Sequence, residues 1–223
     1  MILLDIDDTL IDHSKAEYLA SIQFGEYFHK FIPEYDEKYF ASRWKSEAEK
    51  YYKKFLLGEV SFKEQRQLRI KGIFKNENMS ITDIDEYFKY YKKKYEDNWE
   101  LFDDVKPFLE KNREEGFGII SDGQHEQQTY KLKKMGILKY INFIVTAESS
   151  KSSKPNKKIF EQAIKLSKCK KDELCYIGDS LEKDAIGAKN AGIEGILLNR
   201  NGLIKANNVI VIQSLSDYSR KNA

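Results

Sequence analysis

The 223-residue chain has few of the residues that interrupt regular structure or cross-link a small fold. It contains 3 prolines, 12 glycines and 2 cysteines, Cys169 and Cys175. Two cysteines six positions apart match neither a disulfide framework nor the ligand spacing of a zinc site. The sequence also has no run of about 18 apolar residues, which argues against a membrane-spanning helix.

A large charge of one sign is missing as well. The chain has 38 basic and 36 acidic residues, and its formal net charge is +2. So small an excess gives little attraction for nucleic acid or for an anionic membrane surface, and we expect neither partner. The first residues, Met-Ile-Leu-Leu-Asp, lack the basic and apolar regions of a secretory signal. We therefore expect a cytoplasmic protein.

Aromatic residues are abundant in one region of the chain. Residues 13–98 hold 10 of the 14 tyrosines and 8 of the 13 phenylalanines, with only three glycines and one proline. Apolar side chains recur there at helical spacing, which predicts four helices. These helices are expected at residues 14–31, 36–57, 61–74 and 82–99. Ser61 with Glu64 resembles a capping box, and Thr82 with Asp85 resembles a weaker one. The predicted buried face of the first helix consists of Leu19, Ile22, Phe24, Tyr27, Phe28 and Phe31.

The rest of the sequence alternates short apolar runs with helical segments. Strands are predicted at residues 2–6, 118–121, 142–146, 174–177, 195–198 and 209–212. Helices are predicted between them at residues 105–115, 127–134, 157–168 and 183–190. This alternation is typical of a doubly wound, Rossmann-like α/β fold with a parallel sheet. We predict an α/β catalytic core of residues 1–12 and 100–223, with residues 13–99 inserted as an all-helical, four-helix cap domain.

Polar residues follow four of the predicted strands at the point where each strand ends. Ligands of doubly wound sheets bind at the carboxyl ends of the strands, so we expect these residues to form one site. They are Asp5, Asp7, Asp8, Ser121, Asp122, Gly123, Lys154, Asp179 and Asp184.

The residue types in this group suit phosphoryl transfer. Carboxylates that crowd together need a cation or a shared proton, and oxygen ligands of this kind suit Mg²⁺. Lys154 can supply a fixed positive charge, and Ser121 can supply hydrogen-bond donors to a phosphate. An ionised carboxylate can attack phosphorus, while a second one protonates the leaving alcohol and then activates water.

Four stretches of the sequence resemble, in order, the four motifs of the haloacid dehalogenase-like superfamily. They are Asp5-Ile6-Asp7-Asp8-Thr9-Leu10, Ser121, Lys154-Pro155, and Gly178-Asp179-Ser180 through Asp184. Gly123, Gln128 and Lys131-Leu132 form a supporting stretch that is also similar. The resemblance implies that Asp5 is the nucleophile and that Asp7 is the general acid and base. It implies a phosphate site of Thr9, Ser121, Asp122, Gly123 and Lys154, in which Asp122 either contacts substrate or shapes the turn. It further implies Mg²⁺ ligands from Asp5, Asp7 through its backbone carbonyl, Asp179 and Asp184, the last either directly or through a neighbour.

Two positions bear on the reaction within the superfamily. Its dehalogenases lack an acid at the position of Asp7, which favours phosphate over carbon–halogen chemistry. Asp8 stands where many sugar-phosphate phosphatases and the β-phosphoglucomutases carry glycine, and with this cap type the motif looks more like the nucleotidase and acylneuraminate-phosphate phosphatase branches. The absence of the mutase-like glycine also favours water over a sugar hydroxyl as acceptor. We predict a Mg²⁺-dependent phosphatase that hydrolyses a small phosphorylated metabolite, a nucleoside monophosphate or a sugar phosphate, through an aspartyl phosphate.

The alternatives are a phosphomutase of the β-phosphoglucomutase type, a 2-haloacid dehalogenase and a phospho-acceptor receiver module. A receiver carries its acceptor aspartate after a middle strand and has no helical cap, whereas Asp5 follows the first predicted strand. We expect a monomer, with a dimer as the alternative.

Overall fold

The computed structural model describes residues 1–219 and divides the chain into two compact units. The first unit is Met1–Asp12 with Glu100–Ala223, and the second is His13–Trp99. The last four residues of the predicted core lie outside the described residues. The chain therefore leaves the first unit after its first strand and returns to it after the 87 residues of the second unit.

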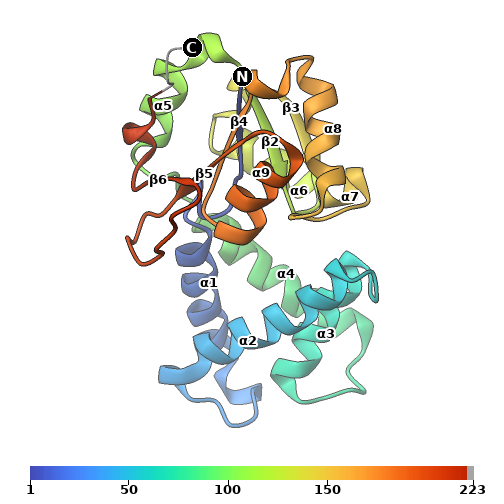
Figure 1. The fold of residues 1–223 in the computed structure, drawn as a ribbon. Helices are drawn as coiled ribbons and strands as arrows, with labels where there is room; N and C mark the ends of the chain where they lie inside the picture. Colours follow the sequence, from blue (N-terminus) through green and yellow to red (C-terminus); the bar gives the residue numbers. More distant parts are fainter. Residues whose placement is uncertain (220–223) are drawn as a thin grey trace. The chain divides into compact units, whose positions relative to one another are not determined.

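The first unit is built on a six-stranded sheet (Figure 1). Its strands are β1 (Ile2–Leu4), β2 (Phe117–Ser121), β3 (Ile141–Thr146), β4 (Cys175–Gly178), β5 (Glu194–Leu198) and β6 (Ile210–Ile212). They lie in the order β3-β2-β1-β4-β5-β6, and every neighbouring pair is parallel. The chain order reverses at β1, between β2 and β4. This arrangement confirms the doubly wound α/β prediction and its six strands.

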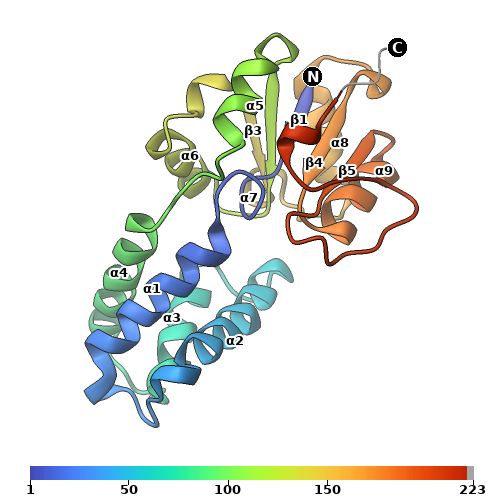
Figure 2. The ribbon, with the colours of Figure 1, turned by 90° about the vertical axis from the view of Figure 1, so that its left-hand side faces the viewer.

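Helices cover both faces of the sheet. They are α5 (Val105–Lys111), α6 (His125–Lys134), α7 (Ala147–Ser150), α8 (Lys157–Ser167) and α9 (Gly187–Ala191), with a π-helical segment, η5 (Leu181–Ile186), before α9. Figure 2 shows α5 and α6 on one side of the sheet and α8 and α9 on the other. The strands run outward from β1 to β2 and β3 and then return past β1 to β4 and β5, and crossovers of this kind place helices on both faces of a sheet.

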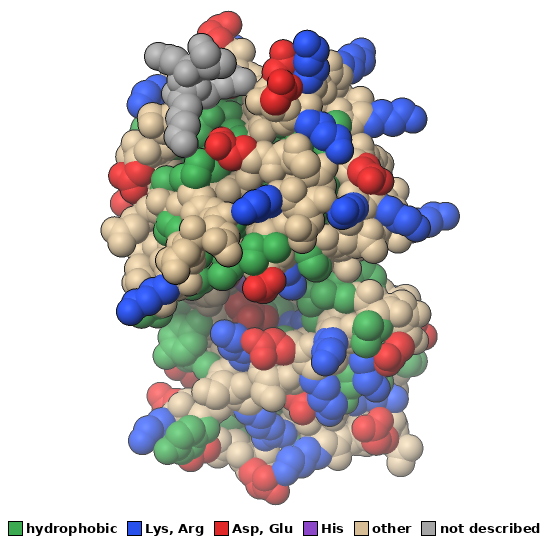
Figure 3. All heavy atoms as spheres, in the orientation of Figure 1, with side chains coloured by type: hydrophobic (Ala, Val, Ile, Leu, Met, Phe, Trp, Pro, Cys, Tyr) green, Lys and Arg blue, Asp and Glu red, His purple; other side chains and the backbone are tan. Residues whose placement is uncertain are grey.

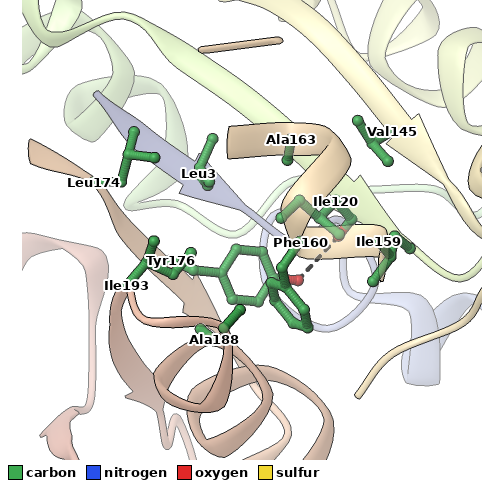
Figure 4. Packing of buried hydrophobic residues seen from close by; sticks show 11 residues of the cluster. Leu3, Ile120, Val145, Ile159, Phe160, Ala163, Leu174, Tyr176, Ala188 and Ile193 are labelled. Atoms are coloured by element: carbon green, nitrogen blue, oxygen red, sulfur yellow. Dashed lines mark hydrogen bonds between the residues drawn. The ribbon is translucent and has the colours of Figure 1, made fainter. Parts of the chain in front are cut away.

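The core between the sheet and helices α8 and α9 is apolar and contains one tyrosine (Figure 4). The Tyr176 ring packs edge-on against Phe160, with ring centroids 5.5 Å apart. Its hydroxyl donates to the backbone carbonyl of Ile120 at 2.9 Å. Burying one large apolar side chain contributes about 1.5–3 kcal/mol. The packing thus fixes a hydroxyl group close to the carboxyl ends of β2 and β4.

The second unit consists of four helices and a 3₁₀ turn, which confirms the predicted all-helical insertion. The helices are α1 (His13–Phe28), α2 (Glu37–Leu56), α3 (Phe62–Phe74) and α4 (Ile81–Asp97). Ser61 and Glu64 form the expected capping box at the start of α3. The predicted cap at Thr82 is wrong. Ser80 caps α4 by accepting from the Asp83 backbone at 3.1 Å, because its extended backbone places the hydroxyl at the first turn.

The interior of the helical unit is aromatic. Phe24 is fully buried, and its ring lies within 6.5 Å, centroid to centroid, of six other aromatic rings. The predicted face of α1 is partly wrong, because Tyr27 is 65% and Phe31 is 67% exposed. The buried face instead follows the four-residue steps Ala16, Ala20 and Phe24.

The surface carries both signs of charge. On the face shown in Figure 3, Lys and Arg side chains are interspersed with Asp and Glu over each unit. No helix within residues 1–219 is long and apolar enough to cross a bilayer.

Candidate active site

The turn that follows β1 begins with Asp5. The Asp5 backbone N–H donates to the Ile177 carbonyl at 3.0 Å, so the chain stays beside β4 for one residue beyond the strand. It then turns, and Asp8 adopts a left-handed backbone with φ of 57°. The Asp8 N–H donates to the Ile11 carbonyl at 2.8 Å and closes the turn. Aspartate is one of the few side-chain-bearing residues that adopt this conformation readily, which explains its place here.

Lys154 lies at the centre of the buried charges. Its side chain is 4% exposed, and its Nζ is 2.8 Å from Asp5 Oδ1 and 2.7 Å from Asp184 Oδ1. Nζ also donates to the Tyr176 hydroxyl at 3.0 Å. These contacts use all three donors of the ammonium group. The Lys154 backbone N–H donates to Asp122 Oδ1 at 2.8 Å, which anchors the loop that carries the lysine.

Asp184 reaches the site from the π-helical segment η5. Its Oδ2 accepts from the Ser180 backbone N–H at 2.9 Å, while Oδ1 accepts from Lys154. A Cβ atom at Gly178 would lie 2.5 Å from Asp184 Cγ. Position 178 therefore requires glycine, because any side chain would displace this carboxylate. Asp179, directly after it, begins the loop from β4 to η5.

Three carboxylates meet near the ends of β1 and β4. One oxygen each from Asp5, Asp179 and Asp184 lies within 4.8 Å of the others. Burial, together with the neighbouring Asp184 and Asp8 carboxylates, raises the pKa of Asp179 to about 6, although Lys154 opposes the shift. Burial also raises the pKa of Asp5 above its usual value; Lys154 opposes this, and the other carboxylates reinforce it. One lysine does not neutralise three carboxylates. A set of hard oxygen donors with excess negative charge fits Mg²⁺.

Ser121 ends β2 and is 2% exposed. Its Oγ accepts from Gln128 Nε2 at 2.6 Å and from the Gly123 backbone N–H at 3.4 Å. Asp7 lies on the other side of the same glutamine. Its Oδ2 accepts from Gln128 Nε2 at 2.9 Å, and its Oδ1 accepts from Lys131 Nζ. The Asp7 carboxylate is thus held by two side chains from α6.

The structure brings Asp5, Lys154, Asp179 and Asp184 into one cluster, as the strand ends predict. Thr9 was expected to contact phosphate, but in the structure it contacts Asp179. Its side chain is fully buried, and its hydroxyl donates to Asp179 Oδ1 at 3.4 Å. Asp122 was predicted to contact substrate or to shape its own turn; in the structure it accepts from the Lys154 backbone N–H and so anchors the loop that carries the lysine. The Asp7 carboxylate is not part of the three-carboxylate cluster.

Sequence reasoning gave no role in the site to Tyr176, Gln128 or Lys131. Tyr176 interrupts the apolar strand β4 with a hydroxyl two residues before Gly178. Gln128 and Lys131 are spaced by three residues on α6 and share the buried face with Leu132. Polar residues at positions where a helix normally buries apolar ones were the available signal.

Comparisons with known proteins agree with this architecture. The family model described as haloacid dehalogenase-like hydrolase matches residues 2–198. Glyceraldehyde 3-phosphate phosphatase of Methanothermobacter thermautotrophicus is 37% identical over 82 residues, which are 37% of this chain and 36% of that protein. The pyrimidine 5'-nucleotidase YjjG of Escherichia coli is 34% identical over 83 residues, 37% of each chain. The alignments therefore span little more than a third of these curated relatives.

A solved structure is similar over a greater length. The hydrolase YfnB from Bacillus subtilis, in a form bound to magnesium, matches with a TM-score of 0.79 at 22% identity. The match covers 96% of this chain and 94% of that one. At this identity the likeness shows the shared fold.

Proposed function

Because the chain belongs to the haloacid dehalogenase-like hydrolase family, we propose that it is a phosphatase of small phosphomonoesters that acts through an aspartyl phosphate. One observation carries this proposal: a fully paired, buried Lys154 lies between Asp5 and Asp184. A second acid, Asp7, lies two residues beyond Asp5 and is held separately. In this proposal, residues 1–12 and 100–223 form the catalytic core and residues 13–99 form the cap.

The phosphoryl group is held by fixed positive charge and by hydrogen-bond donors. Lys154 supplies the charge, and its bonds to Tyr176 and Asp184 fix its Nζ before the substrate arrives. The Ser121 hydroxyl supplies a donor at the end of β2. Preorganised groups of this kind stabilise the charge of the transition state without moving during the reaction.

Asp5 is the proposed nucleophile. One carboxylate oxygen forms a bond to phosphorus as the bond from phosphorus to the leaving oxygen breaks. Asp7 gives its proton to that leaving oxygen and becomes a carboxylate. The same carboxylate then takes a proton from water, whose oxygen attacks the phosphorus of the aspartyl phosphate. This second step releases inorganic phosphate and restores both acids.

Mg²⁺ is the proposed cofactor. Asp5, Asp179 and Asp184 would hold it, together with the backbone carbonyl of Asp7 that the family resemblance implies. When bound, the ion would neutralise phosphoryl charge and keep Asp5 ionised. Thr9 holds Asp179 in place by the hydrogen bond from its hydroxyl.

The proposed substrates are sugar phosphates, with nucleoside monophosphates as the second class. Support comes from the names of the two curated relatives, a glyceraldehyde 3-phosphate phosphatase and a pyrimidine 5'-nucleotidase. The argument from Asp8 against a mutase is weaker than the sequence suggested. With φ of 57°, position 8 suits glycine and aspartate alike, so its identity reflects the backbone rather than the phosphoryl acceptor.

The test is release of inorganic phosphate from a panel of sugar phosphates and nucleoside monophosphates by the purified protein. We expect the wild type and the exposed-site control Asp103→Asn to release phosphate, and Asp5→Asn to release none. Equal activity of Asp5→Asn would contradict the proposal. A hexose monophosphate that is isomerised faster than it is hydrolysed would favour the mutase instead.

A further inference from the structure

A single amide group connects the proposed acid to the proposed phosphate-binding serine. Gln128 is 1% exposed, and its Nε2 donates to Asp7 Oδ2 at 2.9 Å and to Ser121 Oγ at 2.6 Å. In its ionised form Asp7 only accepts hydrogen bonds, so in that form the amide nitrogen rather than the oxygen faces it. Both hydrogens of the amide nitrogen are then used, and the glutamine has one orientation.

This orientation determines what the serine hydroxyl can do. Ser121 Oγ receives a hydrogen bond from Gln128 and a longer one from the Gly123 backbone N–H. Its own hydrogen is used by neither of these contacts. The hydroxyl can therefore act as a donor to a phosphoryl oxygen.

Lys131 gives the same carboxylate a second partner. Its side chain is 2% exposed, whereas that of Asp7 is 30% exposed, and Nζ pairs with Asp7 Oδ1. An ammonium group is costly to bury unless it is paired, and the ion pair with Asp7 offsets this cost for Lys131. Its position is therefore explained by Asp7 and not by packing alone.

The local sequence makes room for this arrangement. Gln128 and Lys131 are three residues apart on α6 and so lie on one helix face. A Cβ atom at position 123 would lie 2.6 Å from Gln128 Nε2. Gly123 lies in the loop between β2 and α6, and because it has no side chain it leaves the space that the glutamine occupies.

We propose that Gln128 and Lys131 are positioning residues: they hold the Asp7 carboxyl for proton transfer to the leaving oxygen, and Gln128 also orients the Ser121 hydroxyl. This inference rests on the proposed phosphatase function. When Asp5 attacks phosphorus, the proton of Asp7 moves to the leaving oxygen as its bond to phosphorus breaks. The Asp7 carboxylate that remains keeps Gln128 as a donor to one oxygen and Lys131 as a donor to the other.

The first test varies the basicity of the leaving group. The substrates are p-nitrophenyl, phenyl and benzyl phosphate, which are similar in size and differ in how much they need a proton donor. kcat/KM reports the steps through the first transfer, so it isolates protonation of the leaving group from later hydrolysis. The variant is Lys131→Met, and the matched control is Lys133→Met on the exposed face of α6.

We expect Lys131→Met to lower kcat/KM about 100-fold on benzyl phosphate and less than about threefold on p-nitrophenyl phosphate, because general acids typically contribute 10²–10⁴. Lys133→Met should match the wild type on all three esters. An equal loss on every ester would show a merely structural role and overturn the inference. If the wild type hydrolyses none of the esters, the proposed function itself is contradicted.

Gln128→Met is the second variant, and it serves also if Lys131→Met does not fold. It should show the same dependence on the leaving group. It should in addition weaken inhibition by inorganic phosphate about tenfold, because the Ser121 hydroxyl loses its orientation. Lys131→Met should leave phosphate inhibition unchanged. Unchanged phosphate inhibition in Gln128→Met would overturn the part of the inference that concerns Ser121.

Discussion

The two units of the molecule bury different kinds of side chain. In the helical unit, Phe24 packs among aromatic rings, and its neighbours need only shape and apolar surface. In the α/β unit, Lys154 is buried with Asp5 and Asp184, and each charge depends on the others. Apolar packing loses stability in proportion to the atoms removed, whereas a buried charge cluster loses much stability when a substitution leaves one of its charges without a partner. The comparison separates apolar packing, which stabilises both units, from the buried charges of the α/β unit, to which the proposed chemistry is assigned.

Burying the charged cluster costs free energy, because burial disfavours the ionised form of a carboxyl group. Burial raises the pKa of Asp5 and of Asp179 above the usual values for aspartate. Groups shifted in this way are typical of functional sites. Packing below the cluster, including the Tyr176 ring, offsets part of this cost.

The largest expected effect is on catalysis by Asp5→Asn. Removing the nucleophile should lower kcat/KM by about 10⁴-fold or more. The thermal midpoint should stay unchanged or rise, since crowding of like charges is relieved and Lys154 keeps Asp184 as a partner. Phosphate release and thermal unfolding measure the two effects. A variant that is both inactive and strongly destabilised would show that the cluster is structural.

Lys154→Met should affect activity and stability together. Loss of the fixed charge should lower kcat/KM by about 10²–10³ on every substrate, as for other preorganised transition-state donors. Asp5 and Asp184 would lose their buried partner, at a cost of about 3–5 kcal/mol in unfolding free energy. Urea unfolding and a substrate panel test this. The control Lys157→Met, exposed at the start of α8, should change neither. A change in substrate preference with little loss of rate would contradict the assignment.

Mg²⁺ binding should weaken as the pH falls. The pKa of Asp179 is raised to about 6, so below that pH the carboxyl keeps a proton that the ion must displace. We expect an apparent affinity about tenfold weaker at about pH 5 than at about pH 7, with little change above pH 7. Calorimetric titration with Mg²⁺ at each pH measures it. Equal affinity at both pH values would remove Asp179 from the ligand set.

The smallest effect on activity is expected from Phe24→Leu. This variant should lose about 1–2 kcal/mol of unfolding free energy through poorer packing and lost ring contacts. Hydrolysis of p-nitrophenyl phosphate should stay within about twofold of wild type, since Phe24 is buried among the aromatic rings of the helical unit and the proposed catalytic residues belong to the α/β unit. Tyr27→Leu, at an exposed position of the same helix, should cost less than about 0.5 kcal/mol. A large loss of activity in Phe24→Leu at unchanged stability would contradict this division.

The fold was predictable because the sequence pattern has two clear periods. Strand and helix alternation predicted the six strands and the helical insertion, and the strand ends predicted the cluster of Asp5, Lys154, Asp179 and Asp184. Helix faces were less predictable. Alanines at 16 and 20 carry a weak hydrophobic signal, so the larger Tyr27 was assigned to the interior although it is exposed.

One physical reason explains why sequence reasoning gave some residues of the site no role. These residues are buried, and they are Tyr176, Gln128 and Lys131. Polar residues are uncommon in the interior, and the spacing of apolar residues predicts only which positions are buried and not what a polar side chain does there. Their contacts depend on which strand lies beside which. Motif residues lie at strand ends and can be located without that knowledge.

The most direct test of the account is to trap the intermediate on Asp5. Asp7→Asn should still accept the phosphoryl group from p-nitrophenyl phosphate, whose leaving group needs no acid, but should hydrolyse the aspartyl phosphate slowly. Reduction with borohydride after rapid mixing converts an aspartyl phosphate to homoserine, which peptide mass spectrometry locates. We predict homoserine at position 5 in Asp7→Asn and none in the Asp5→Asn, Asp7→Asn double variant. Release of p-nitrophenol without any homoserine at position 5 would contradict covalent catalysis by this chain.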